Sequence, residues 1–360
     1  MMKIRLLPLG FIVILFVCSS PTLAAIKDVK NAQQQWLEIN SKVADAYRSG
    51  NYEEGVTLAQ YGYSFAELHF GKEHPATYAS MNSLAMLYKA QGRYHDAELL
   101  YKEIYQLSQK LLGPEHSATL GAMNNLAGLY VAQGRYGAAE PLYDTVLHVK
   151  TKILGHEHAT TLASMSNLAS LYQMQGRHDE AQPLLEKVYQ LTNKNLGHAH
   201  PNTVRAMNNL AILYKSQKRY NKAEPLYHEA LQLNEKNIGE KHPQTITTMN
   251  NLAVLYDTQG RYDEAEPLYQ KVLQLSEEVL GPEHPDTINA MHNLAAMYDA
   301  QGRTSDAEQL FSKTLKLSEK VLGPNHPISY SAKQKLASIR DTQGGFDASR
   351  PPFLLVNITP

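Results

Sequence analysis

The 360-residue sequence predicts an all-α fold, a solenoid of tandem antiparallel helix pairs. The first observation behind this prediction is a 42-residue period, clearest in seven regularly spaced histidines: His74, His116, His158, His200, His242, His284 and His326. The second is that glycines mark the same period twice per unit, half a period apart. Between these glycines the apolar residues keep helical spacing, and a period of this length is typical of stacked repeats.

The N-terminal stretch is predicted to be a secretory signal peptide. Lys3 and Arg5 precede an apolar run over residues 6–17, and the small residues Ala24 and Ala25 offer a cleavage site. The run is shorter than the roughly 20 residues that span a bilayer, so a permanent membrane helix is the weaker interpretation. We therefore expect an exported protein with no bilayer span, periplasmic or secreted after cleavage.

The single cysteine, Cys18, lies inside this stretch, so the exported chain would have no disulfide, thiolate metal site or cysteine nucleophile. An alternative makes Cys18 the lipid anchor of a lipoprotein, although Val17 is bulky where a small residue is usual.

The formal net charge of the whole chain is −1. Because this balance provides no overall basic field, neither nucleic acid nor anionic lipid is an expected partner.

Each repeat unit contains two predicted helices. In one well-kept unit the first, helix A, has apolar residues at i, i+3, i+4 and i+7, namely Met249, Leu252, Ala253 and Tyr256. The second, helix B, carries a similar stripe, formed by Ala265, Leu268, Tyr269, Val272 and Leu275. Histidine-proline pairs open the units because proline suits the first helical position, and glycine suits the left-handed position after a helix. Lys218 replaces one such glycine, which is expected to lower the stability of the fold by about 1 kcal/mol.

The unit resembles the tetratricopeptide repeat in the order of its leucine, small residue, tyrosine, glycine, tyrosine and alanine, here Leu252, Ala253, Tyr256, Gly260, Tyr262 and Ala265. Its length and the joining sequence LGPEHP are similar to the long repeats of kinesin light chain and its bacterial relatives. The resemblance covers residues from about 33 to 344. It implies a right-handed superhelix whose concave side is lined by the A helices.

The predicted organisation is a signal peptide over residues 1–25, a solenoid over 26–344 and a C-terminal tail over 345–360. The solenoid divides into a degenerate first repeat at 33–73, six 42-residue repeats over 74–325, and a capping helix at 327–342. Such end units are needed because each repeat buries its apolar face only against the next. The apolar tail is expected to cover the last helix, and the alternative is a short strand offered to a partner.

Asparagines occupy the middle of helix A in most units, although asparagine is a mediocre helix former. One set stands directly before the packing leucine: Asn125, Asn167, Asn209, Asn251 and Asn293. A second set precedes it by one residue: Asn82, Asn124, Asn208 and Asn250. In tetratricopeptide proteins the first set commonly faces the groove and bonds to the backbone of an extended peptide, which an amide suits because it both donates and accepts. The alternative is that these amides bond internally, tying one helix A to the next.

Neighbouring positions on helix A are expected to provide ligand specificity. The resemblance places Lys89, Arg205, Lys215, Asp257 and Asp299 at groove positions, with the basic residues earlier in the chain than the acidic ones. Only Arg205 sits at a position of the family's carboxylate clamp for acidic chaperone tails. Binding of such tails is therefore not expected.

The sequence contains no phosphate-binding loop, nucleophile elbow or paired-carboxylate pattern. Histidines 42 residues apart fall on successive units and cannot converge on one metal ion. We therefore expect no cofactor, no metal and no enzyme activity. The predicted function is an exported scaffold that binds an extended peptide or protein segment in its concave groove through the asparagine row. The alternative is a structural or assembly component of the cell envelope that uses the convex face or the ends.

Overall fold

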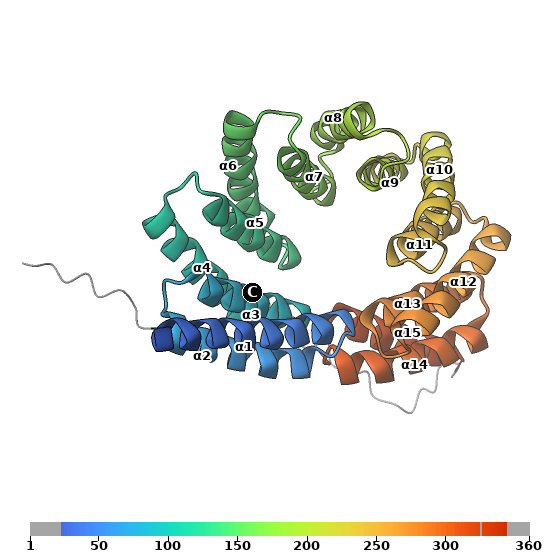
Figure 1. The fold of residues 1–360 in the computed structure, drawn as a ribbon. Coiled ribbons are helices and arrows are strands. Elements are labelled where there is room, and N and C mark those ends of the chain that lie inside the picture. Colours follow the sequence, from blue (N-terminus) through green and yellow to red (C-terminus); the bar gives the residue numbers. More distant parts are fainter. Residues whose placement is uncertain (1–22, 325, 344–360) are drawn as a thin grey trace, which may run out of the picture.

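The computed structural model describes residues 23–324 and 326–343, which form fifteen α-helices and contain no strand. The odd-numbered helices are the A helices: α1 (Leu23–Arg48), α3 (Pro75–Ala90), α5 (Ser117–Ala132), α7 (Ala159–Met174), α9 (Pro201–Ser216), α11 (Pro243–Thr258), α13 (Pro285–Ala300) and α15 (Pro327–Gln343). The even-numbered helices are the B helices: α2 (Tyr52–Phe70), α4 (Tyr94–Leu112), α6 (Tyr136–Leu154), α8 (His178–Leu196), α10 (Tyr220–Ile238), α12 (Tyr262–Leu280) and α14 (Thr304–Val321). The predicted α-solenoid is confirmed. Its helix pairs follow one another around a ring, with the A helices on the inside (Figure 1).

The helix bounds keep the predicted 42-residue period from α3 onward, and α15 occupies the place of the predicted capping helix at 327–342. The first helix differs from the expectation. It begins at Leu23, ten residues before the predicted start of the first repeat and inside the predicted signal peptide. The greater part of that peptide, residues 1–22, and the predicted tail at 345–360 lie outside the described residues.

The periodic histidines have a role that the sequence analysis did not assign. Each lies directly before an A helix, and the six that precede α3 to α13 have an extended backbone. The imidazole Nδ1 of each accepts a hydrogen bond from the backbone N–H two residues later, as His116 does from Ala118 at 3.2 Å. This bond satisfies one of the amide groups that have no partner inside the first helical turn. The histidines are therefore helix caps. Their position directly before the helix-opening residue is the sequence feature that identifies them.

The core depends on close approach of neighbouring helices. At least one alanine is fully buried in each A helix from α3 to α13 and in each B helix from α4 to α14. Large side chains from the B helices, such as Tyr227 and Phe311, fill the space between consecutive units and are themselves fully buried. Since buried alanine leaves no space for a larger group, enlargement at any of these positions would force the helices apart.

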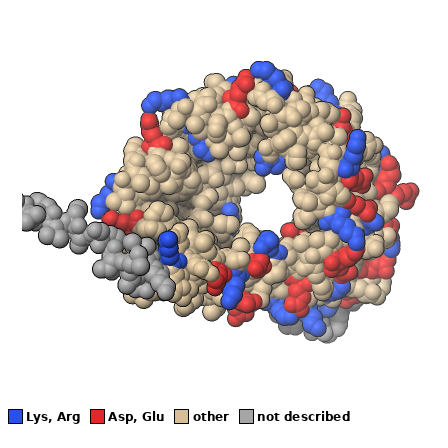
Figure 2. Space-filling view, viewed as in Figure 1, with Lys and Arg blue, Asp and Glu red and all other residues tan. Residues whose placement is uncertain are grey.

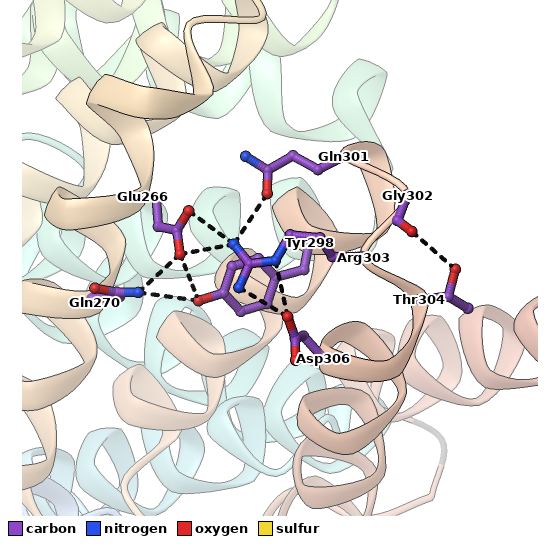
Figure 3. A network of polar contacts seen from close by, with 8 residues as sticks. All are labelled: Glu266, Gln270, Tyr298, Gln301, Gly302, Arg303, Thr304 and Asp306. Carbon is purple, nitrogen blue, oxygen red and sulfur yellow. Dashed lines mark hydrogen bonds and ion pairs between the residues drawn. The ribbon is translucent and has the colours of Figure 1, made fainter.

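A charged network on the outer part of the ring also links neighbouring units (Figure 3). The guanidinium of Arg303, at the start of α14, lies 3.9 Å from the centroid of the Tyr298 ring and 2.8 Å from the carboxylate of Glu266 on α12. Tyr298 donates its hydroxyl hydrogen to the same carboxylate at 3.1 Å. A partly buried ion pair of this kind, held by several hydrogen bonds, stabilises more than an isolated surface pair.

The same network recurs in the units from α5/α6 to α11/α12, with one change. Arg135, Arg177 and Arg261 contact a glutamate of the preceding B helix, whereas Arg219 contacts the neutral amide oxygen of Gln182 on α8 at 3.0 Å. The junction between the α7/α8 unit and the α9/α10 unit therefore lacks the ion pair found at its neighbours. Lys218 lies at this junction and is the one described non-glycine residue with a positive φ, 59°.

Replacement of Lys218 by glycine is expected to stabilise the protein by about 1 kcal/mol, because a side chain in the left-handed region costs about that much. The measurement is the urea midpoint of unfolding, compared with Lys218→Ala, which loses the charge and keeps the strained conformation. A glycine variant no more stable than the alanine variant would contradict the assignment of strain to this residue.

A second prediction concerns pH. The carboxylate of Glu98 is 13% exposed; burial by itself would raise its pKa, but hydrogen bonds from Lys102 and Arg135 lower the pKa to about 2. Because the pKa is lower in the folded state than the ordinary 4.5, the stabilisation is complete above that value and is lost as the pH falls toward about 2.

Glu98→Gln is therefore expected to lower stability by about 1 kcal/mol at pH 7, with a deficit that shrinks as the pH drops from about 4.5 to about 2. Urea unfolding across this pH range measures it. The reciprocal variant, Gln182→Glu, should gain stability at pH 7 by adding the missing ion pair to Arg219. A deficit of Glu98→Gln that does not change with pH would show that the ion pair is not its cause.

Candidate functional site

The inner surface of the ring is the candidate site. Figure 2 shows an opening through the centre of the molecule, surrounded mainly by uncharged side chains, while most of the charged side chains in this view lie toward the outside. A cavity of about 450 Å³ lies along α3, α5 and α7, and its lining includes Met86, Lys89, Asn125 and Asn167. Three of the predicted asparagines, Asn124, Asn125 and Asn167, thus line this cavity.

The asparagines form a ladder along this wall. In each rung, the asparagine directly before the packing leucine donates a hydrogen bond from its amide nitrogen. The acceptor is the amide oxygen of an asparagine of the second set, on the preceding A helix. Four rungs connect Asn125 to Asn82 at 2.7 Å, Asn167 to Asn124 at 2.8 Å, Asn251 to Asn208 at 3.2 Å, and Asn293 to Asn250 at 3.1 Å. The separation of 43 residues places the two partners on consecutive A helices, which explains why asparagine recurs despite its low helix propensity.

Each rung occupies only part of the hydrogen-bonding capacity of its two amides. An asparagine side chain has two N–H donors and an oxygen with two acceptor positions, and a rung takes one donor from one residue and one acceptor from the other. All these asparagines are half-buried, so part of each amide remains at the surface. The ladder therefore holds the amides in a fixed orientation while leaving groups that can bond to a peptide backbone.

One rung is missing. Asn209 on α9 faces Ser166 on α7, where the neighbouring units have an asparagine, and within the described residues no hydrogen bond joins the two side chains. Ser166 instead donates to the carbonyl oxygen of Leu162 in its own helix at 3.1 Å. The sequence pattern indicates Asn209 but not the significance of Ser166, because the 43-residue pairing becomes evident only in three dimensions.

The predicted specificity residues lie in different surroundings. Lys89 and Lys215 are half-buried with no acidic partner among the described residues, and burial lowers the pKa of both ammonium groups. Burial raises the pKa of Asp257, whose carboxylate accepts a hydrogen bond from the Tyr269 hydroxyl at 3.3 Å. The inner wall therefore presents ionisable groups that a charged ligand would help to compensate.

The other two charged candidates differ from these three. Asp299 forms an ion pair with Lys335 of α15 at 2.7 Å, so this acidic position is already compensated. Arg205 is exposed and contacts the amide oxygen of Asn202 at 3.3 Å, with no acidic partner among the described residues. Arg205 is thus a cationic group available to a ligand.

Contact between the first and seventh units closes the ring, and in Figure 1 α1 approaches the α13–α15 region. His284 caps α13 through Nδ1, so its proton is on Nε2, which donates to the carbonyl oxygen of Arg48 at 3.1 Å. Gly50 lies so near that a Cβ added there would be 2.5 Å from the Cδ of Pro285. Beside this contact is an open crevice of about 740 Å³. A narrow contact therefore converts the concave groove into a closed channel.

Other kinds of site are not formed by the described residues. No group of three His, Cys, Asp or Glu side chains within residues 23–324 and 326–343 is arranged to hold a metal ion. None of the helices in these ranges is both long and apolar enough to cross a membrane.

Comparison with known proteins agrees with this geometry. The tetratricopeptide repeat family model matches residues 37–110, 79–152, 117–194, 160–227, 202–273 and 258–320. These matches cover more than half of the sequence, and the chain belongs to the tetratricopeptide repeat family. Proteins of this family are generally non-enzymatic scaffolds that bind protein partners, so the chain is a scaffold suited to protein–protein interaction. A search of curated proteins gave no match.

Solved structures with the same fold include a tetratricopeptide repeat protein from Parabacteroides merdae, 19% identical, with a TM-score of 0.54 over 85% of this chain and 99% of that one. The Cut9-Hcn1 hetero-tetramer of the APC/C matches at 17% identity and a TM-score of 0.52, over 82% of this chain and 48% of that one. A Podosopora anserina putative kinesin light chain, with nearly identical repeats, is 29% identical over 57% of this chain and 97% of that one, with a TM-score of 0.48. The neighbours therefore include a kinesin-light-chain-like repeat protein, as the sequence predicted.

Closure of the ring yields a prediction with a matched control. Gly50→Ala and Gly92→Ala place the same side chain at nearly the same left-handed φ, 73° and 72°, so both carry the same backbone cost. Only the Gly50 variant would collide with Pro285, since nothing lies within 4 Å of a Cβ at Gly92. We expect Gly50→Ala alone to raise the radius of gyration in small-angle X-ray scattering. Identical scattering from the two variants would contradict the closing role of this contact.

Proposed function

We propose that the protein is an exported scaffold that binds an extended segment of a partner protein along the inner wall of its ring. The observation that carries this proposal is the asparagine ladder, which presents oriented amide groups at regular intervals along one wall. An extended peptide has donors and acceptors at regular intervals, and amides can bond to these whatever the side chains of the peptide are. The ladder thus supports recognition of the backbone, with the charged groups adding selectivity.

The closed ring limits how such a ligand enters. A segment at the end of a chain can be threaded through the central opening, whereas an internal segment requires the contact between His284 and Arg48 to open. Among the described residues, one hydrogen bond and a small apolar contact hold this junction, so its opening costs little compared with separating two stacked units. Unstructured termini are the favoured ligands, and internal segments are bound in the opened ring.

Export is the second part of the proposal. It is supported by the sequence alone, through the basic start, the apolar run and the small residues of the N-terminal stretch. The site of action would be a periplasm or the extracellular space.

One observation favours a second candidate function. The asparagine amides bond to one another, as a purely structural role would require, so the ladder can act only to stiffen the solenoid. The protein would then be an assembly component of the cell envelope whose contacts are made through the outer face or the ends. The two candidates differ in which face of the ring touches the partner.

Photo-cross-linking from the two faces separates the candidates. A photoreactive phenylalanine derivative replaces either Met86, which is 38% exposed on the inner wall, or Leu99, which is 57% exposed on the outer helix α4. We expect cross-links in the native host from position 86, confined to one short continuous stretch of the partner. Asn125→Ala with Asn167→Ala should reduce their yield about tenfold, the effect of losing one or two hydrogen bonds.

Cross-links from position 99 alone would overturn groove binding in favour of the structural candidate. The same preparation tests export, since the recovered protein should begin at Ala25 or Ile26. An intact N-terminus beginning at Met1 would rule out the predicted cleavage.

A further inference from the structure

The ladder positions between α13 and α15 carry titratable residues in place of asparagines. One 42-residue period beyond the last asparagine rung they are His292 of α13 and Lys335 of α15. Within the described residues no hydrogen bond joins these two side chains. The ammonium of Lys335 pairs with Asp299 of α13 at 2.7 Å, and Nε2 of His292 lies 3.2 Å from the hydroxyl of Ser331 on α15. An imidazole and an ion pair therefore link α13 to α15 where neutral amides link the other A helices.

The surroundings of His292 are suited to a neutral imidazole. Phe311 of α14 meets the ring edge to face, with 5.4 Å between the two ring centroids. The Nδ1 atom is buried and has no hydrogen-bond partner among the described residues. In a neutral imidazole one nitrogen carries the hydrogen, and the Ser331 hydroxyl can bond to Nε2 in either tautomer because it both donates and accepts. The neutral ring thus needs no further partner that is charged.

A second proton on His292 would be unfavourable in this place. The protonated imidazole carries an N–H at both nitrogens, and the new N–H at Nδ1 would be a buried donor without an acceptor. Its positive charge would also be repelled by Lys335. Burial, together with the charge of Lys335, accordingly lowers the pKa of His292.

The carboxylates that join these helices are already neutralised by partners. Asp299, on the same helix as His292, pairs with Lys335 of α15. Glu308 of α14 pairs with Arg340 of α15 at 3.4 Å, and the group that α14 places against the imidazole is the uncharged Phe311 ring. The charge that acts on His292 from these helices is therefore the positive charge of Lys335.

The direction of the pH effect follows from the lowered pKa. Because the pKa of His292 is lower in the folded state than the ordinary 6.5, folding favours the neutral ring. The stabilisation is complete above that value, and it is lost as the pH falls from there toward the lowered pKa. Asparagine does not titrate, so the four asparagine rungs keep their strength over this range. Mild acid therefore weakens the ladder at its last position.

The helix held by this junction, α15, packs on one side only. It is the last described helix, and Ala337 is exposed although the equivalent alanines of α3 to α13 are fully buried. The buried apolar side chains of α15 are Ala332, Leu336 and Ile339. Because so few side chains hold α15, its local release costs less free energy than unfolding of the whole solenoid.

The start of α15 lies beside the contact that closes the ring. His326, which caps α15, lines the 450 Å³ cavity together with Tyr47 of α1 and Ala90 of α3. Gly323, between α14 and α15, lines the open crevice that also includes Gly50. The segment leading into α15 thus belongs to the same region as the closing contact. Displacement of α15 would therefore disturb the closure of the ring.

From these observations we propose that the junction between His292 and α15 is an acid-sensitive switch that opens the ring. At neutral pH the imidazole is uncharged, α15 stays packed on α13 and the ring is closed. In mild acid His292 takes up a proton from water, α15 separates from α13 and the closing contact is released. The consequence for binding rests on the proposed function: internal segments of a partner would enter or leave the ring in acid.

The test is hydrogen exchange of the full chain at about pH 7.5 and about pH 5.5, with rates corrected for the intrinsic effect of pH, a range in which histidine titrates. Protection of α15 is compared with that of α9, which also has a capping histidine, so that loss of caps affects both helices. His292→Asn introduces the residue found at this ladder position in four other units. His148→Asn makes the same change at an exposed site of α6 and is the matched control.

We expect α15 in the wild type and in His148→Asn to lose about tenfold of its protection relative to α9 in acid, the effect of one buried N–H without an acceptor. His292→Asn should keep the same relative protection at both pH values. The radius of gyration from small-angle X-ray scattering should rise in acid for the first two proteins and stay constant for His292→Asn.

Three outcomes would contradict the switch. Unchanged α15 protection in the wild type, or an equal loss in His292→Asn, would overturn the role of His292. Loss of α15 protection at a constant radius of gyration would overturn the opening of the ring. Each result leaves groove binding standing, because no ligand is present in the experiment. Should His292→Asn not fold, Lys335→Asn takes its place: it removes the adjacent cation and should reduce the acid response, and an unchanged response overturns the inference.

Discussion

Every other feature of this protein depends on the close contact between consecutive helix pairs. A single pair cannot bury its apolar face, so each unit is stable only against its neighbours. Fully buried alanines permit this contact, and tyrosine and phenylalanine side chains from the B helices fill the remaining space. Because each unit is added in nearly the same orientation, residues at equivalent positions fall into rows that follow the curve of the solenoid. The ladder, the outer ion pairs and the helix-capping histidines are all such rows.

Under the proposed function, the amide ladder combines a structural and a binding role in one row. Its bonds fix the orientation of side chains that would otherwise lose rotamer freedom when a ligand binds, which lowers the entropic cost of recognition. The bonds also connect A helices that already meet through apolar packing. Internal bonding and peptide binding are therefore compatible, and the presence of one does not exclude the other.

The departures from the repeat are as informative as the repeat. Ser166, Gln182 and Lys218 each replace the residue that the period leads one to expect, and all three lie at one junction. The result is a local loss of internal contacts at this junction. On the opposite side of the ring, Gly50 and His284 depart from their equivalents in forming the contact that closes the channel (Figure 1). A regular array thus acquires particular sites through a few substitutions.

The sequence by itself determined the fold class and the 42-residue period of the helices. The 42-residue period, the alternation of helical stripes with glycines and the histidine-proline pairs are local or nearly local signals, and helix formation and stopping depend on residues a few positions apart. That the asparagines of helix A face the groove is a prediction from the family resemblance. The sequence did not predict the length of α1, because the first repeat departs from the pattern that located the other repeats.

Only the tertiary structure decided which residues meet across units. The 43-residue pairing of the ladder, the missing rung at Asn209 and the contact of His284 with Arg48 all depend on how much each unit rotates relative to the last. That rotation is set by the packing of many side chains at once, so small changes accumulate around the ring. The repeat therefore specified a solenoid, whereas the sum of its packing angles specified a closed ring with a particular lining.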